Sequence, residues 1–420
     1  MTRHISRRFA STGALLVAGA LALTACGGSG FEQPADDAAS GGTTELTSSD
    51  DALSVLIASS GDAETDAVTD AVADWSADSG VTADVQVASD LPQQLSQGFA
   101  AGSPPDLFYL SPDAIAGYAD NGSLQPYGDL VEHKDDFYPS LVENFTVDGT
   151  FYCAPKDFST LGLVINTRLW EDAGLTDADV PTTWDELATV AKTLTTDDHV
   201  GLALSNEYQR LGVFMAEAGG GLVVDDEPVA NSAGSVEGLE YVQTHLTDGT
   251  FAYAADLGAG WPGEAFGKEQ AAMTVEGNWI TGALSTDFPD VEYTVAELPA
   301  GPAGQGTLQF TNCWGMAADS PNQQAALDLV AHLTSTEQQL AFSKAFGPMP
   351  STESAAGDWT SANPDLAAFL DGAQYAQFPP TWAGATDVIT DLNSQLESLE
   401  GGDPQQILDD TQSNLEAIAE

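Results

Sequence analysis

The chain has 420 residues, of which 64 are acidic and only 10 are basic, so its formal net charge is −54. Such a charge repels nucleic acid and anionic lipid surfaces, which excludes DNA or RNA binding as its function. The acidic residues are scattered along the sequence, which indicates a solubility property of the whole surface and disfavours an acidic ligand. A hydrophobic content of 43% and eight tryptophans predict a folded protein with a sizeable core.

The first 25 residues have the pattern of a secretory signal peptide. A basic start is followed by an apolar stretch at 14–23 and by Leu-Thr-Ala-Cys-Gly at 23–27. This ending resembles a bacterial lipobox, which implies cleavage before Cys26 and acylation of its thiol; an ordinary signal peptide with a chance cysteine is the alternative. Residues 26–51 are rich in small and polar residues and predict a flexible tether. We therefore expect a lipid-anchored protein at the extracytoplasmic face of the cell membrane.

Short strands and helices alternate at the start of the folded part. The strands are expected at 53–58, 81–87 and 106–110, and the helices at 63–76, 91–101 and about 113–121. This order predicts a parallel sheet with crossover helices.

Residues 151–158 then predict a strand that crosses into a second lobe. Further elements are expected as strands at 161–166 and 200–205, a helix at 235–245, one amphipathic helix from Ser320 through Leu340, and a terminal helical region at about 382–419. We assign 52–154 with about 300–350 to lobe 1, and 155–299 with about 351–420 to lobe 2.

The segment 266–284 joins a buried strand to a helix. Ala271–Val275 is an apolar run of strand length, and Glu276-Gly277-Asn278 ends it. Trp279 follows on the strand-to-helix turn, at the end of the strand where open α/β sheets bind small molecules. The alternative is a core tryptophan that closes the sheet edge.

Residues Lys268–Trp279 resemble a segment of the sugar-binding proteins of ABC importers, the extracellular solute-binding protein family 1 that includes maltose-binding-like proteins. In that family a Gly-x-Trp follows an Ala-Ala-Met strand, and the tryptophan stacks on a sugar ring. Pro105-Asp106, Gly117-Tyr118-Ala119 and the run Pro181–Leu187 are similar to the family as well. The resemblance implies a two-lobed α/β periplasmic-binding-protein-like fold of type II, in which each lobe is a mostly parallel sheet flanked by helices and joined by hinge crossovers.

The resemblance also implies a function. We expect a substrate-binding lipoprotein that captures a mono-, di- or oligosaccharide between its lobes and delivers it to the membrane subunits of an ABC permease. It is expected to be a monomer, to need no cofactor and not to be an enzyme. The alternatives are a binder of another solute, such as a polyamine or a metal chelate, and an exported carbohydrate-active enzyme, for which a carboxylate pair could be chosen among so many acids.

The candidate ligand-binding residues come partly from alignment on these landmarks and partly from the residue types themselves. Asp113 falls where the family places a carboxylate that grips hydroxyls, although a helix N-cap is the rival role. The chain departs from the family where Ser159 replaces a sugar-binding glutamate. Arg210 is expected in an ion pair, either structural or ligand-binding, and Trp261 as either a second ring or a core residue. The candidates are Trp279, Asp113, Glu207, Asp157, Lys156, Asp62, Arg210, Trp261, Trp314 and Trp382.

With Cys26 assigned to the lipid, two cysteines remain. Cys153 and Cys313 both lie next to predicted lobe crossings, and in an exported chain this predicts a disulfide; two buried free thiols are the alternative. We expect no metal site, because there is no EF-hand loop and no His/Cys ligand spacing; calcium at Asp225-Asp226-Glu227 is the rival. No G-x-S-x-G, H-E-x-x-H, Walker or dinucleotide-binding pattern is present.

Overall fold

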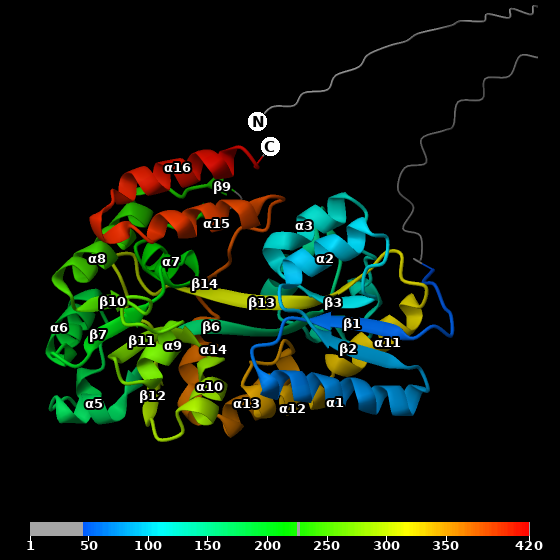
Figure 1. The fold of residues 1–420 in the computed structure, drawn as a ribbon, viewed down its shortest axis with the longest axis horizontal. Coiled ribbons are helices and arrows are strands. Elements are labelled where there is room, and N and C mark those ends of the chain that lie inside the picture. Colours follow the sequence, from blue (N-terminus) through cyan, green and yellow to red (C-terminus); the bar gives the residue numbers. More distant parts are fainter. Residues whose placement is uncertain (1–44, 225–226, 420) are drawn as a thin grey trace, which may run out of the picture. The chain divides into compact units, whose positions relative to one another are not determined.

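The computed structural model of the chain describes residues 45–224 and 227–419 (Figure 1). The predicted signal peptide, Cys26 and most of the tether lie outside these residues, as do Asp225 and Asp226 of the acidic cluster. Their predicted roles therefore stay predictions. Among the helices described, none combines the length and the apolar character that crossing a membrane requires.

The central sheet has the strand order β10-β7-β11-β6-β13-β3-β1-β2, with β12 paired to β6 and β14 paired to β13. Two short hairpins, β4–β5 and β8–β9, lie outside it. The strands are β1 (Leu53–Ile57), β2 (Ala83–Val87), β3 (Leu107–Leu110), β4 (Thr146–Val147), β5 (Thr150–Phe151), β6 (Pro155–Asn166), β7 (Val200–Leu204), β8 (Val223–Val224), β9 (Glu227–Pro228), β10 (Phe251–Tyr253), β11 (Ala271–Gly277), β12 (Tyr293–Ala296), β13 (Thr307–Met316) and β14 (Ala376–Gln377).

Two long strands join the two halves of this sheet. β1 pairs in parallel with β2 and β3 in one half, and β7 pairs in parallel with β10 and β11 in the other. β6 and β13 pair with each other in antiparallel fashion, β6 also pairs with β11, and β13 also pairs with β3. The sheet therefore has two mostly parallel ends linked by two crossing strands, the arrangement of a two-lobed α/β fold.

Helices cover the sheet at both ends. In Figure 1, α2 and α3 lie above the β1–β3 part of the sheet, and α1 and α12 lie below it. The helices are α1 (Asp62–Ser79), α2 (Leu91–Ala100), α3 (Pro112–Asp120), α4 (Pro139–Asn144), α5 (Thr167–Asp172), α6 (Trp184–Leu194), α7 (Tyr208–Glu217), α8 (Ala233–Asp248), α9 (Pro262–Gly267), α10 (Ile280–Asp287), α11 (Gln323–Leu333), α12 (Thr336–Phe346), α13 (Ala356–Ala362), α14 (Ala367–Gly372), α15 (Ala385–Leu396) and α16 (Pro404–Glu416).

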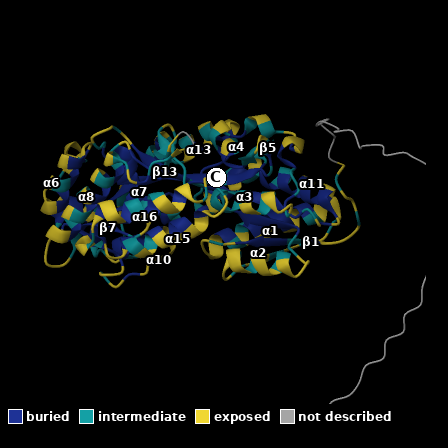
Figure 2. Cartoon of the chain, turned by 90° about the horizontal axis from the view of Figure 1, so that it is seen from above, coloured by how far each residue is buried: buried dark blue, intermediate teal, exposed yellow. Residues whose placement is uncertain are grey.

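Each half has its own hydrophobic core, seen as the dark interior in Figure 2. One core contains Phe108 and Trp314, and the other contains Phe214 and Met273. A smaller cluster that includes Phe158 lies where the crossing strands meet the helices. Amphipathic spacing explains how the helices join these cores: α6 buries Leu187, Val190, Ala191 and Leu194 on one face.

The prediction of one helix from Ser320 through Leu340 is wrong, because the structure has two helices there, α11 and α12. The Thr334 hydroxyl bonds to the carbonyl oxygen of Val330 at the end of α11, and the Ser335 side chain accepts the backbone N–H of Gln338 to start α12. A hydroxyl that caps a new helix competes with continuation of the old one. The terminal helical region is likewise divided into α15 and α16, and α16 begins at Pro404 after the capping side chain of Asp403.

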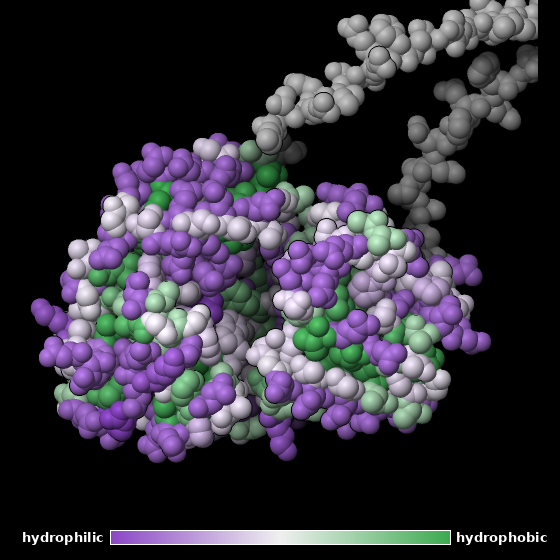
Figure 3. Space-filling model, in the orientation of Figure 1, coloured by the Kyte–Doolittle hydropathy of each residue, from purple (hydrophilic) through white to green (hydrophobic). Residues whose placement is uncertain are grey.

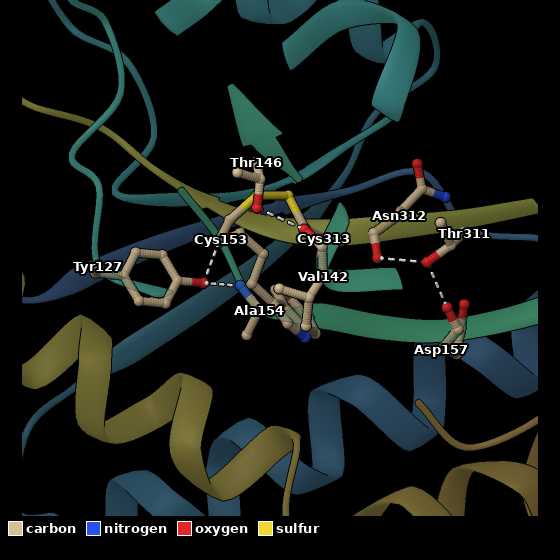
Figure 4. The surroundings of a disulfide bond; sticks show 10 residues. Tyr127, Val142, Thr146, Cys153, Ala154, Asp157, Thr311, Asn312 and Cys313 are labelled. Carbon is tan, nitrogen blue, oxygen red and sulfur yellow. Dashed lines mark hydrogen bonds between the residues drawn. A yellow bond between two sulfur atoms is a disulfide. The ribbon is translucent and has the colours of Figure 1, made fainter. Parts of the chain in front are cut away.

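A disulfide joins Cys153 and Cys313 at the lobe 1 end of the crossing strands (Figure 4). Their Cα atoms are 5.7 Å apart, and both side chains are buried. The Tyr127 hydroxyl accepts the N–H of Ala154 at 3.2 Å and donates to the carbonyl oxygen of Trp314, so it connects the residue before β6 to β13. The start of β6 is thus fixed to β13 by both a covalent bond and a buried tyrosine.

Candidate functional site

A cleft of about 430 Å³ lies over the crossing strands, between the two halves of the sheet. Its walls are built from the residues that follow β1, β3 and β11, together with residues of β6 and β13. Figure 3 shows the surface hollowed between the two halves. The carboxyl ends of strands from both lobes therefore converge on one concave site, which is where α/β sheets commonly bind small molecules.

Trp279 lies in this cleft at the turn between β11 and α10. Its indole N–H donates to the carboxylate of Glu276 at 2.7 Å, and its ring meets the edge of Phe310 with centroids 5.7 Å apart. A Cβ atom built on Gly277 would lie 2.3 Å from the indole, so the ring rests directly against that glycine. The ring is held in one orientation by these contacts and still lines the cleft.

Arg210 and Glu276 form a two-bond ion pair beside the indole. Arg210 Nε donates to Glu276 Oε1 at 3.1 Å and Nη2 donates to Oε2 at 3.0 Å. Glu276 is fully buried, and the Arg210 guanidinium carbon lies 5.2 Å from the centroid of the Trp279 ring. Arg210 is therefore in an ion pair, as the sequence predicts, and its contact with a ligand stays a prediction.

A second charged cluster is centred on Lys156, on the crossing strand β6. Its ammonium contacts Glu64 Oε1 at 3.1 Å and a carboxylate oxygen of Asp157, and it lies 4.5 Å from the centroid of the Tyr109 ring. Glu64 also accepts the Tyr109 hydroxyl at 3.0 Å and two bonds from Ser60. The cluster therefore connects α1 and β3 to the crossing strand.

The pKa values of this cluster follow from burial and pairing. Burial alone would lower the pKa of Lys156, but Asp157 and Glu64 hold that pKa well above its usual value. Burial alone would raise the pKa of Glu64, but Lys156 and the hydrogen bonds from Ser60 lower it. Burial outweighs the attraction of Lys156 at Asp157 and raises the pKa of that carboxyl. Lys156 thus keeps its charge, and that charge is shared by two carboxylates.

Asp113 also lines the cleft, but it does not cap its helix. Ser111 occupies the N-cap position of α3, and the Asp113 carboxylate accepts the Thr386 hydroxyl of α15 at 2.8 Å. Ser159 lines the cleft as well, and its hydroxyl accepts the N–H of Asn278 at 3.1 Å. The structure therefore brings four predicted residues to one cleft, namely Trp279, Asp113, Lys156 and Asp157.

Two more predicted residues lie in a neighbouring cavity of about 490 Å³. Asp62 is exposed at the start of α1. Trp261 directly precedes α9, and its side chain is half-buried. This cavity and the cleft share Ser60, Glu64 and Trp279 among their walls, so the two are contiguous.

The remaining four predicted residues, Arg210 among them, do not line the cleft. Glu207 is exposed at the start of α7 and accepts the Ser205 hydroxyl at 3.2 Å. Trp382 is half-buried against the core of lobe 2. Placing Trp314 in the site is corrected by the structure: it lies within β13 and points into the core of lobe 1, where it is 1% exposed.

Sequence reasoning missed Glu64, Phe310 and Phe346, which all line the cleft. Glu64 lies in the first turn of α1, where an acidic residue is usually solvated, and the sequence offers 64 acids to choose from. The two phenylalanines follow apolar patterns that also fit a core. Among the residues that the structure describes, no group of His, Cys, Asp or Glu side chains is arranged to hold a metal ion.

Residues 70–368 of this chain match the family model of the bacterial extracellular solute-binding proteins. A putative binding protein of Brucella abortus is 25% identical over 362 residues, which cover 81% of this chain and 86% of that protein. The diacetylchitobiose binding protein of Streptomyces coelicolor is 24% identical over 284 residues, which cover 65% of this chain and 66% of that protein.

Solved structures share the fold at lower identity. An ABC substrate-binding protein of Listeria monocytogenes in complex with cycloalternan superposes with a TM-score of 0.78 at 22% identity, covering 87% of this chain and 98% of that chain. A Mycobacterium tuberculosis protein in complex with glycerophosphocholine gives 0.77 at 18% identity, covering 88% and 98%. Likeness at this level shows the two-lobed fold, and the ligand must be argued from the site.

Proposed function

Because the chain belongs to the bacterial extracellular solute-binding proteins, we propose that it captures a saccharide in the cleft and delivers it to the membrane permease of an ABC importer. The observation that carries this proposal is the fixed indole of Trp279 facing a cleft that also presents Asp113 and Asp157. Binding proteins of this fold close two lobes around a ligand, and closure offers the permease a recognisable surface.

The chemistry of a sugar suits these side chains. A pyranose has a face of C–H bonds, which packs on an aromatic ring, and a rim of hydroxyl groups, which donate to carboxylates and amides. Trp279 supplies the ring and Phe310 lies at its edge. Asp113, Asp157 and Asn278 supply polar atoms around it. The Streptomyces coelicolor relative, named for diacetylchitobiose, supports the choice of a carbohydrate.

The wider setting of this function is proposed from the sequence. The lipobox-like ending at Cys26 supports a lipid anchor at the extracytoplasmic face of the cell membrane, with the following residues as a tether. We assign 52–154 with about 300–350 to lobe 1 and 155–299 with about 351–420 to lobe 2. The protein acts as a monomer and as a binder without turnover.

Titration calorimetry of the purified full-length chain with a saccharide panel tests the proposal. The panel contains glucose, galactose, N-acetylglucosamine, maltose, cellobiose and chitobiose. We expect at least one of them to bind, and Trp279→Ala to weaken that binding by about 30-fold or more, because a buried aromatic anchor contributes about 2 kcal/mol or more. The same change should lower uptake of that sugar by cells.

Leu130→Ala is the control, because Leu130 is an apolar side chain that is 39% exposed and does not line the cleft. It should leave the affinity unchanged. Spermidine, a metal chelate and glycerophosphocholine are titrated in parallel, together with a chromogenic glycoside for turnover. Binding of one of these solutes with no response to any sugar, or release of the chromophore, would contradict the proposal.

A further inference from the structure

We propose that this cleft discriminates against anionic saccharides, so that its ligand is a sugar without carboxylate or phosphate groups. This inference deepens the proposed function and rests on it. It is carried by the way in which the positive charges at the cleft are already engaged by the protein's own carboxylates.

Lys156 is the basic residue among those that line the cleft in the described part of the chain. Its side chain is 7% exposed, and its ammonium contacts both Glu64 and Asp157. Two aromatic rings also lie against it, with the Tyr109 and Phe346 ring centroids 4.5 and 5.6 Å from Nζ. An ammonium has three N–H donors, so two carboxylates and two rings leave little of it for a ligand.

Arg210, the cation behind Trp279, is engaged as well. Its guanidinium donates two hydrogen bonds to the fully buried Glu276. The geometry is the fork-on-carboxylate pairing that arginine forms most strongly. Breaking this pair to reach a ligand would leave a carboxylate buried without a partner, which is expensive. Neither cation is therefore available to neutralise an acidic sugar.

The charges that remain at the cleft are negative. Glu64, Asp157 and Asp113 line it together with Lys156, so its walls carry three carboxylates and one ammonium. Asp113 accepts its hydrogen bond from the neutral Thr386 hydroxyl, and it forms no ion pair among the residues that the structure describes. A uronate or a sugar phosphate would lose its hydration in such a site and meet like charge, whereas a neutral hydroxyl can donate to the same carboxylates.

Matched pairs of sugars test this discrimination directly. The probes are glucose and glucuronate, galactose and galacturonate, N-acetylglucosamine and its 6-phosphate, and maltose and its 6′-phosphate, each titrated by calorimetry into the full-length chain. We expect the neutral member of every pair that binds to bind at least about tenfold more tightly. The preference should persist at about 1 M salt, where the Debye length is about 3 Å and the distant surface charge is screened.

Two variants with the same chemical change separate the engaged lysine from the general charge. Asp157→Asn removes one of the two carboxylates on Lys156, so it should release a donor toward the cleft and reduce the preference for the neutral sugar by about tenfold. Asp113→Asn also removes one negative charge from the cleft but frees no donor on Lys156, so the preference for the neutral sugar should fall by only about threefold. Melting temperatures of both variants confirm that they are folded.

The outcomes are distinct. If no sugar of any pair binds, the carbohydrate proposal fails and this inference fails with it. If sugars bind but an acidic member binds as tightly as its neutral partner, this inference alone is overturned. If Asp157→Asn and Asp113→Asn change the preference equally, engagement of Lys156 is not its cause and the inference is overturned as well.

Discussion

The two charged clusters beside the cleft differ in how many carboxylates each cation contacts. Glu276 has one cation to itself, Arg210, with two hydrogen bonds in a fixed plane. Glu64 shares its cation, Lys156, with Asp157, and it completes its hydrogen bonds with Ser60 and Tyr109. The arginine pair lies within lobe 2, on α7 and β11, whereas the lysine cluster connects α1 and β3 of lobe 1 to a crossing strand.

The difference suggests that the arginine pair fixes the shape of the cleft, whereas the lysine cluster fixes its charge. A guanidinium fork fixes the plane of the Glu276 carboxylate, and that carboxylate in turn holds the indole N–H of Trp279 at 2.7 Å. An ammonium has no preferred plane, so Lys156 can serve two carboxylates at once and fixes the charge of the cleft more than its shape. We therefore expect changes at Glu276 to affect stability and ring orientation together, and changes at Glu64 to affect them less.

The largest effect is expected from Glu276→Ala, which leaves Arg210 without its partner. Arg210 is 13% exposed, and removal of one member of a buried pair lowers the free energy of unfolding by about 3–5 kcal/mol. Urea unfolding measures this loss. The indole also loses its acceptor, so the tryptophan fluorescence maximum and the sugar affinity should both change.

Glu276→Gln is the matched variant for this prediction. It keeps one oxygen for the indole N–H, so ring orientation should be largely retained while the charge pair is lost. If Glu276→Ala were as stable as the wild type, or if its sugar affinity were unchanged, the Arg210–Glu276 pair would not be what holds the Trp279 ring in its orientation.

A smaller loss is expected from Glu64→Gln, because Asp157 still neutralises Lys156. A hydrogen bond to a charged group contributes about 1.5–3 kcal/mol, so unfolding at about pH 7 should become easier by about 2 kcal/mol. The pKa of Glu64 is lowered in the folded state. Its contribution is therefore present above the pKa of the unfolded chain and is lost as the pH falls through the lower folded pKa.

The measurement is urea unfolding of both proteins from about pH 7 down to about pH 3. The difference between wild type and Glu64→Gln should shrink toward the acidic end. A difference that stays constant over this range, or that exceeds the loss in Glu276→Ala, would show that the two clusters do not differ in the way described.

The sequence predicted the position of Trp279 because a local rule places it: an apolar run, a Gly-Asn break and a ring at the end of a strand. Trp314 is also a predicted ligand-binding residue, but it lies within β13, where the alternation of a strand turns its ring into the core. Side-chain direction in a strand depends on register, and register depends on partners far away in the sequence. The position of Trp279, by contrast, can be predicted from the residues next to it in the sequence.

The lysine cluster shows more clearly which part of the site the sequence cannot predict. Lys156 and Asp157 were expected at a lobe boundary, but Glu64 lies 92 residues before Lys156 and was not selected. In a chain with 64 acidic residues, composition gives no reason to prefer one of them. Glu64 accepts the backbone N–H and the hydroxyl of Ser60 just before α1, but only the folded contact with Lys156 shows that this carboxylate belongs to the cluster.

The smallest effect is expected from Glu217→Gln, which extends the comparison to a buried carboxyl that forms no ion pair with any described residue. Glu217 is 1% exposed, its carboxyl accepts the indole N–H of Trp184, and burial raises its pKa well above the usual value. A raised folded pKa means that its stability contribution is present below the unfolded pKa and is lost as the pH rises, the reverse of Glu64. Glutamine resembles the neutral acid, so the free energy of unfolding of the variant, relative to the wild type, should rise by about 1 kcal/mol between about pH 4 and pH 8, without a change in sugar affinity.

Unfolding in urea at both ends of this pH range measures the gain. A loss that grew toward pH 8 would mean that the ionised carboxylate is stabilised there, and that a buried acid in this protein does not need a cation.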